Sequence, residues 1–233
     1  MTEKCPLPQE WRVETLRNLN SASKATIDPG EFPEEVFEYY SIPAYQENSK
    51  PALVRGKDIH SLKLLLRAGA VLFGKLNPRV EKVWKVGPNE GHRQIGSTEW
   101  LPILPDGKIA DSEYIYFVCW SKHVMPLAKT LVAGSTPSRQ RVDPTAFYEI
   151  NIPLPPLPEQ KQIAGVLGAV QEAKEKTEAV IAAAKELKKS LMKHLFTYGP
   201  VPVEDAENVP LKETEIGPMP EHWDVVRLDE IVV

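Results

Sequence analysis

The sequence has few cysteines and no long apolar run, and each absence excludes a class of protein. Only Cys5 and Cys119 are present, too few for a disulfide framework or a cysteine-rich zinc site. The five histidines lack the spacing of metal ligands, so no metal site is predicted. No apolar stretch approaches the roughly 20 residues of a membrane span, and the polar first ten residues do not form a signal peptide. We therefore expect a cytoplasmic protein without a membrane partner.

Motifs for catalysis are missing as well. The sequence has no glycine-rich phosphate loop ending in Lys-Ser or Lys-Thr, no His-Glu-x-x-His and no convincing Cys/His nucleophile pair. Asn77-Pro78-Arg79 departs from the Asn-Pro-Pro-aromatic motif of amino-methyltransferases, and no S-adenosylmethionine loop is present. We predict no catalytic residue and no cofactor, because an enzyme would need a site that the sequence does not show.

The net charge of -4 is an average over segments of opposite sign. Residues 198–233 carry nine acidic and two basic side chains, and residues 27–47 carry six carboxylates with no lysine or arginine. Residues 50–93, the basic stretch, carry ten basic against three acidic side chains, a balance of +7. The average therefore does not exclude a nucleic-acid partner, and the basic stretch indicates where one would bind.

Local patterns in residues 1–158 predict a mixed domain with many short elements. Residues 70–73 and 113–120 have the β-branched and aromatic composition of strands, whereas residues 59–67 and 124–132 show a helical periodicity that is weak elsewhere in the region. Turn signals containing proline and glycine separate these segments. The expected fold class is α+β, with a compact β-rich domain followed by a long helix.

A cluster of prolines between residues 153 and 158 marks the end of this domain, and a long helix is predicted over residues 159–197. Apolar and small residues recur there at alternating steps of three and four, as in a coiled coil. The seam comprises Ile163, Val166, Val170, Ala173, Thr177, Val180, Ala184, Leu187 and Leu191. A helix of roughly 33 residues is about 50 Å long, so we expect a second helix to cover much of the seam. The alternative is one amphipathic helix lying on its own domain.

The two ends of the chain contain an internal repeat. Residues 6–19, PLPQEWRVETLRNL, align with residues 218–231, PMPEHWDVVRLDEI, at a constant offset. The matching positions include both prolines and Trp11 with Trp223. The chain therefore contains one period of a duplicated architecture and the start of the next. We expect each tryptophan to anchor the segment that follows it to a core.

The strongest motif is FYEINIPLPPLPEQKQIA at residues 147–164, and it resembles the junction between recognition domain and spacer helix in specificity (S) subunits of type I restriction-modification systems. Supporting segments are GSTPSRQRV at 134–142, KLNPR at 75–79 and KETEIG at 212–217. A full member of that family has two recognition domains and two spacer helices. The resemblance therefore implies a half-length S subunit, either natural or truncated.

The resemblance also implies a domain organisation and a set of partners. Residues 1–158 would form a DNA target recognition domain, residues 159–197 a spacer and dimerisation helix, and residues 198–233 an acidic linker leading into a second repeat. The partners would be double-stranded DNA, methyltransferase (M) subunits, and the restriction (R) subunit through the complex. A second copy would supply the missing antiparallel helix, and the homodimer would read an inverted repeat with a gap.

The residues expected to contact DNA fall in two regions. In the basic stretch they are Lys50, Arg55, Lys57, Lys75, Asn77, Arg79 and Lys82, which offer donors to phosphates and base edges. In the second region they are Ser135, Thr136, Arg139 and Arg141, which follow the flexible Gly134.

Other interpretations of these features remain open. The basic stretch could be a solvated face, Asn77-Pro78 only a turn, and the second region a helix cap and surface loop. Most of the aromatic residues are expected in the core, because they lie in apolar runs. An adaptor that binds the methyltransferase or a full S subunit through its coiled coil, without contacting DNA, is the alternative function.

Overall fold

The computed structural model describes residues 8–23, 25–134 and 139–227. The chain forms two compact units, residues 1–169 and 170–233, and each is described by itself. The boundary falls within the helix α5 (Leu157–Tyr198). No helix in these described ranges is both long and apolar enough to cross a membrane.

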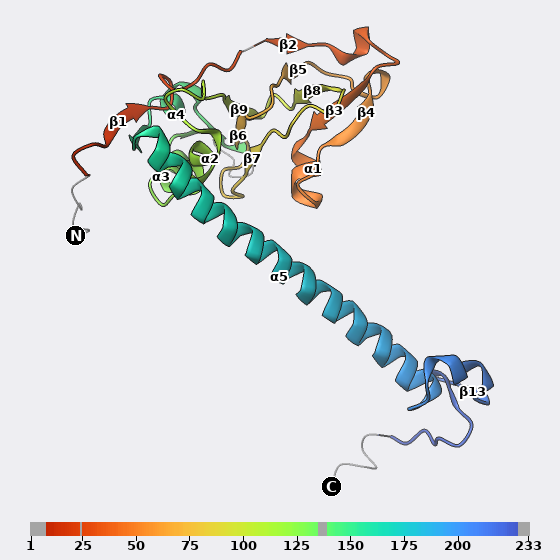
Figure 1. Ribbon diagram of the computed structural model, residues 1–233. Coiled ribbons are helices and arrows are strands. Elements are labelled where there is room, and N and C mark those ends of the chain that lie inside the picture. The colour runs from red at the N-terminus through yellow and green to blue at the C-terminus, as the bar shows by residue number, and fades with distance from the viewer. Residues whose placement is uncertain (1–7, 24, 135–138, 228–233) are drawn as a thin grey trace. The chain divides into compact units, whose positions relative to one another are not determined.

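Two sheets organise the first unit (Figure 1). The five-stranded sheet contains, in spatial order, β2 (Thr26–Ile27), β5 (Lys63–Leu65), β8 (Arg93–Gly96), β3 (Val36–Tyr40) and β4 (Ala52–Arg55). The three-stranded sheet contains β7 (Val83–Lys85), β6 (Val71–Gly74) and β9 (Trp100–Ile103). Two antiparallel pairs complete the strands: β1 (Arg12–Thr15) with β12 (Asn151–Leu154), and β10 (Val132–Ala133) with β11 (Arg141–Val142).

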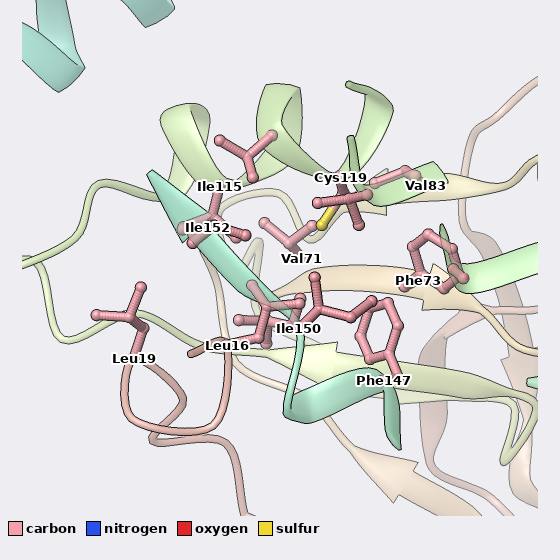
Figure 2. Close-up of a cluster of buried hydrophobic side chains, with 14 of the residues drawn as sticks. Leu16, Leu19, Val71, Phe73, Val83, Ile115, Cys119, Phe147, Ile150 and Ile152 are labelled. Atoms are coloured by element: carbon pink, nitrogen blue, oxygen red, sulfur yellow. The ribbon is translucent and has the colours of Figure 1, made fainter. Parts of the chain in front are cut away.

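The helices of the first unit are short apart from α5. They are α1 (Ile42–Glu47), α2 (Ser112–Trp120), α3 (Val124–Thr130) and α4 (Pro144–Tyr148), with 3-10 turns η1 (Pro29–Glu31) and η2 (Gly56–Asp58). The main core lies between α2, the three-stranded sheet, β12 and α4, as Figure 2 shows. Phe73 of β6 and Phe147 of α4 pack with ring centroids 4.5 Å apart. The α+β class with a β-rich domain and a long helix is therefore confirmed.

The strand predicted at residues 113–120 is wrong, because this segment is the helix α2. The Asp111 side chain caps its start by accepting a hydrogen bond from the Tyr114 amide at 3.0 Å. The buried residues Tyr114, Ile115, Val118 and Cys119 lie at helical spacing and face the core. A helix cap and burial of one face therefore override the β-propensity of the residues.

The helix predicted at residues 59–67 is also wrong, since the segment contains β5, which pairs with β2 and β8. Pairing with β2 and β8 overrides the helical periodicity of this segment. The predictions near β6 and α3 are confirmed, with observed bounds of Val71–Gly74 and Val124–Thr130.

The helix α5 begins at Leu157, two residues before the predicted start, with Pro158 in its first turn, where a missing amide is tolerated. Gln160 is fully buried, and its amide holds the helix on the domain. Its Oε1 accepts from the Asp111 amide at 2.9 Å, and its Nε2 donates to the carbonyl oxygens of Ile109 at 2.9 Å and Pro155 at 2.8 Å.

The first seam residue, Ile163, packs against the core of its own unit. The seam from Val166 onward is exposed.

The second unit contains the rest of α5, the 3-10 turn η4 (Val203–Asn208) and a hairpin of β13 (Leu211–Thr214) with β14 (Gly217–Pro220). The internal repeat is visible in local structure. The Trp11 amide donates to the Pro8 carbonyl at 3.0 Å, and the Trp223 amide donates to the Pro220 carbonyl at the same distance.

The two tryptophans do not both lead into a strand. Trp11 precedes β1 and is half-buried, and its Nε1 donates to Glu159 Oε2 at 3.1 Å. Its anchor is thus the start of α5. After Trp223, none of residues 224–227 lies in a strand.

Candidate nucleic-acid interface

The fold brings the two loops predicted to contact DNA into register with each other. Leu76 and Arg141 form an antiparallel bridge. The Asn77 amide donates to the Gln140 carbonyl at 2.9 Å, and the Val142 amide donates to the Lys75 carbonyl at 3.0 Å. We call residues 75–79 and 139–142 the paired loops. Ser135 and Thr136 lie outside the described residues.

The paired loops present basic side chains of two kinds. Arg79 and Arg139 are exposed and Lys75 is half-buried, and no carboxylate of the described chain lies within ion-pair distance of these three. Arg141 is exposed but is held by Glu99, with contacts of 3.0 to 3.2 Å from Nε and Nη2. These hydrogen bonds raise the pKa of Arg141 further. The loops thus combine three cations without acidic partners with one oriented guanidinium.

Lys82 is not part of this surface, which corrects the expectation that it contacts DNA. Its side chain is buried, and its ammonium donates to the carbonyl oxygens of Asn77, at 3.2 Å, and Val80. Burial lowers the pKa of Lys82. Gly74 makes room for the side chain, since a Cβ there would lie 2.8 Å from two carbons of Lys82. Lys82 therefore stabilises the turn at residues 77–80 from its buried side.

Asn77 occupies a specialised position at the turn. Its φ is +47°, in the left-handed region that asparagine tolerates better than most residues. Its Oδ1 is buried without a hydrogen-bond partner among the described atoms. The neighbouring Pro78 is buried and Arg79 is exposed, so the turn directs the arginine outward.

The remaining predicted contacts belong to a different sheet. Arg55 ends β4, an edge strand of the five-stranded sheet, and Lys57 lies in η2, which directly follows β4. Both are exposed and approach Glu34, at 3.7 and 3.8 Å respectively. Lys50 is exposed just before β4. Exposed pairs of this kind contribute little energy, so these cations remain available to phosphates.

Much of the basic stretch is neutralised internally. Arg93 pairs with Glu35 and stacks on Phe32, with its guanidinium carbon 4.2 Å from the ring centroid. Lys85 pairs with Glu113, and Lys63 is buried with its ammonium on Ser61. The acidic segment 27–47 supplies several of the partners. The +7 balance therefore overstates the free positive charge.

Sequence reasoning missed Glu99 and Gln160 as residues that shape the site. Glu99 orients Arg141, and its carbonyl accepts from the Lys75 amide at 3.0 Å. No periodicity or motif in the sequence places Glu99 beside either loop. Gln160 lies inside the junction motif at residues 147–164, and that motif could have indicated its structural role.

The model of the type I restriction modification DNA specificity domain matches residues 32–185. The chain belongs to this family. The matched range includes both paired loops and the first part of α5.

Known members confirm the resemblance. The specificity subunit of the type I restriction enzyme MjaVIII from Methanocaldococcus jannaschii is 34% identical over 142 residues, covering 61% of this chain and 31% of the relative. The crystal structure of the HsdS subunit from Thermoanaerobacter tengcongensis matches with a TM-score of 0.65 and 25% identity, covering 98% of this specificity-domain chain and 56% of that one.

A further solved chain comes from work on complex assembly and conformational transition of the type I R-M system. It matches with a TM-score of 0.66 and 26% identity over 97% of this chain and 56% of that chain. The specificity-domain chain thus spans about half the length of these two solved chains, and less of the MjaVIII subunit.

Proposed function

We propose that this chain is a non-catalytic DNA-recognition module of a type I restriction-modification complex in the cytoplasm. Residues 1–158 would read one half of a bipartite target. The observation that carries the proposal is the pairing of two loops, which gathers Lys75, Arg79 and Arg139 without acidic partners.

The chemistry of the paired loops suits duplex DNA. Lysine and arginine neutralise phosphates, and arginine can also donate two parallel hydrogen bonds to guanine. We assign Lys75, Arg79, Arg139 and Arg141 to phosphates. Asn77 shapes the turn, because its buried Oδ1 is out of reach of a base edge. Ser135 and Thr136 are proposed as further phosphate donors, and Lys50, Arg55 and Lys57 as a flanking contact.

The helix α5 is proposed to dimerise. Its seam beyond Ile163 has large apolar side chains in contact with solvent, which is costly for a surface without a partner. A second copy running antiparallel would cover the seam and place two recognition domains around a two-fold axis. The dimer would then read an inverted repeat with a gap between its halves.

The same scaffold is proposed to dock the methyltransferase subunits and, through them, the restriction subunit. The support is the identity of the relatives, which are specificity subunits of type I restriction systems.

Mapping methylated adenines in cells that carry this chain with its methyltransferase tests the proposal. An inverted repeat with a fixed gap is expected, and an asymmetric motif would contradict the two-fold arrangement. A shift assay of the assembled complex with Lys75→Ala and Arg79→Ala tests the loops. Binding that is indifferent to both substitutions would instead favour the adaptor that does not contact DNA.

A further inference from the structure

The exposed part of the α5 seam runs from Val166 to Leu191. The apolar members Val166, Val170, Val180, Leu187 and Leu191 are between 45% and 68% exposed. Ile163 is excluded, because it packs on its own core. Any partner helix therefore has eight seam positions to cover, four on each side of the midpoint between Glu178 and Ala179.

We propose that two copies of α5 pair antiparallel around a two-fold axis at that midpoint, an inference that rests on the homodimer proposed above. In such a pair each residue faces the one equally far beyond the midpoint on the other copy. Val166 then faces Leu191, and Val170 faces Leu187. Each outer layer thus joins a valine to a leucine, and no large exposed seam residue is left facing water.

The inner layers are matched in size as well. Ala173 faces Ala184, which lets the two helices approach closely, and Thr177 faces Val180. The Thr177 hydroxyl already donates to the Ala173 carbonyl within its own helix at 2.8 Å. It therefore enters an apolar layer with its hydrogen bond made, which avoids the cost of a buried unpaired donor.

In the competing register the partner helix slides by one heptad, which moves the axis by half a heptad, to Glu175. This register leaves Leu191 opposite Glu159. Lys174 and Lys176 flank the seam, where equivalent positions of the two helices meet, so each lysine would lie beside the same lysine of the other copy. Like charges in such positions are destabilising. Its one gain is contact between Leu167 and Ile181.

In the proposed register Leu167 and Ile181 instead pack along the aliphatic stems of Lys188 and Lys174. Complete coverage of the seam and the absence of self-paired lysines decide for the axis at the midpoint.

The register has a measurable consequence for the target. The two copies of Ile163 would lie about 46 Å apart along the helix pair, against about 36 Å in the competing register, at about 1.5 Å per residue. The difference corresponds to about three base pairs, at about 3.4 Å per base pair.

Disulfide cross-linking of the full chain tests the register. In a Cys5→Ser background, Val170→Cys with Leu187→Cys should shift the protein to the mass of a covalent dimer on oxidation. Val166→Cys with Leu191→Cys is a second pair for the same register. The matched control, Val170→Cys with Val180→Cys, faces itself only in the competing register and should stay monomeric under denaturing conditions.

The outcomes separate the two proposals. A native dimer in which the control pair cross-links, or neither pair of the proposed register does, overturns the register alone. Cross-linking of Val170→Cys by itself indicates parallel helices and overturns it too. A monomeric mass of the unmodified chain by light scattering overturns the homodimer on which the register rests.

Discussion

The backbone amide of Asn77 donates to the carbonyl oxygen of Gln140 at 2.9 Å, so two loops far apart in the sequence share one short ladder. Because the ladder joins the loops that carry Arg79 and Arg139, their contributions to DNA binding are expected to depend on the loop geometry as well as on charge. Substitutions that remove a cation and substitutions that loosen the ladder therefore have different signatures.

Arg79→Ala should weaken DNA binding by the assembled complex and flatten its salt dependence. Because Arg79 is assigned to a phosphate, the slope of log K against log salt should fall by about 0.9 for each phosphate that is no longer neutralised. Electrophoretic shifts at several salt concentrations measure the slope. Arg67→Ala, an exposed arginine outside the paired loops, serves as the control and should keep the parent slope. Equal slopes for both variants would remove Arg79 from the interface.

Lys82→Met should loosen the turn without altering the salt slope. The Asn77 and Val80 carbonyls lose their donor, which costs about 1–3 kcal/mol of folding free energy. Hydrogen exchange at the Asn77 and Val80 amides should accelerate in the free protein, and affinity should fall in the complex. Gly74→Ala, which crowds the lysine but keeps its charge, should act alike. A slope reduced as in Arg79→Ala would show instead that Lys82 reaches a phosphate.

Gln160→Leu should destabilise the first unit by about 3 kcal/mol, because one amide and two carbonyls, each at least partly buried, lose their hydrogen-bond partner. Gln162→Leu is the matched control on an exposed position of the same helix, with an expected change within about 0.5 kcal/mol. Urea unfolding of both variants gives the comparison. A similar small change in each would mean that the helix start does not depend on the Gln160 amide.

Alkaline pH should destabilise the protein through its buried tyrosines. Burial raises the pKa of Tyr114 and of Tyr148 to about 12, whereas tyrosines in the unfolded chain ionise near 10. The unfolded chain then loses protons that the folded chain keeps, so stability is complete below pH of about 10 and falls towards pH of about 12.

Unfolding free energies measured between pH 8 and 12, with tyrosinate absorbance, follow this loss. Tyr148→Phe should make the decline shallower, although it also removes a hydrogen bond to the Pro102 carbonyl. An unchanged decline would contradict a Tyr148 that stays protonated in the folded protein at this pH.

The sequence predicted those features that local pattern decides. The absence of proline after Pro158 and the recurrence of apolar residues predicted α5 to within two residues at each end. The prediction from local pattern was wrong at residues 113–120, where the Asp111 cap and burial of one helix face outweigh the β-propensity of individual residues. Local preference cannot reveal which neighbours the rest of the chain will bring.

The candidate site was predicted residue by residue but not as an assembly. A count of lysines and arginines cannot distinguish exposed Arg79 from buried Lys82, because burial depends on Gly74 and on the turn above it. The bridge between Leu76 and Arg141 is likewise a product of tertiary structure. Composition therefore locates charge, and folding determines how much of it is available.

The antiparallel pairing of β1 with β12 places the first strand of the domain beside its last strand, with Val13 opposite Pro153. Trp11 and Glu159 fasten the same edge. The two ends of the domain are therefore held at one edge by these contacts. Changes in the loops between β1 and β12 are therefore expected to leave the start of α5 in place.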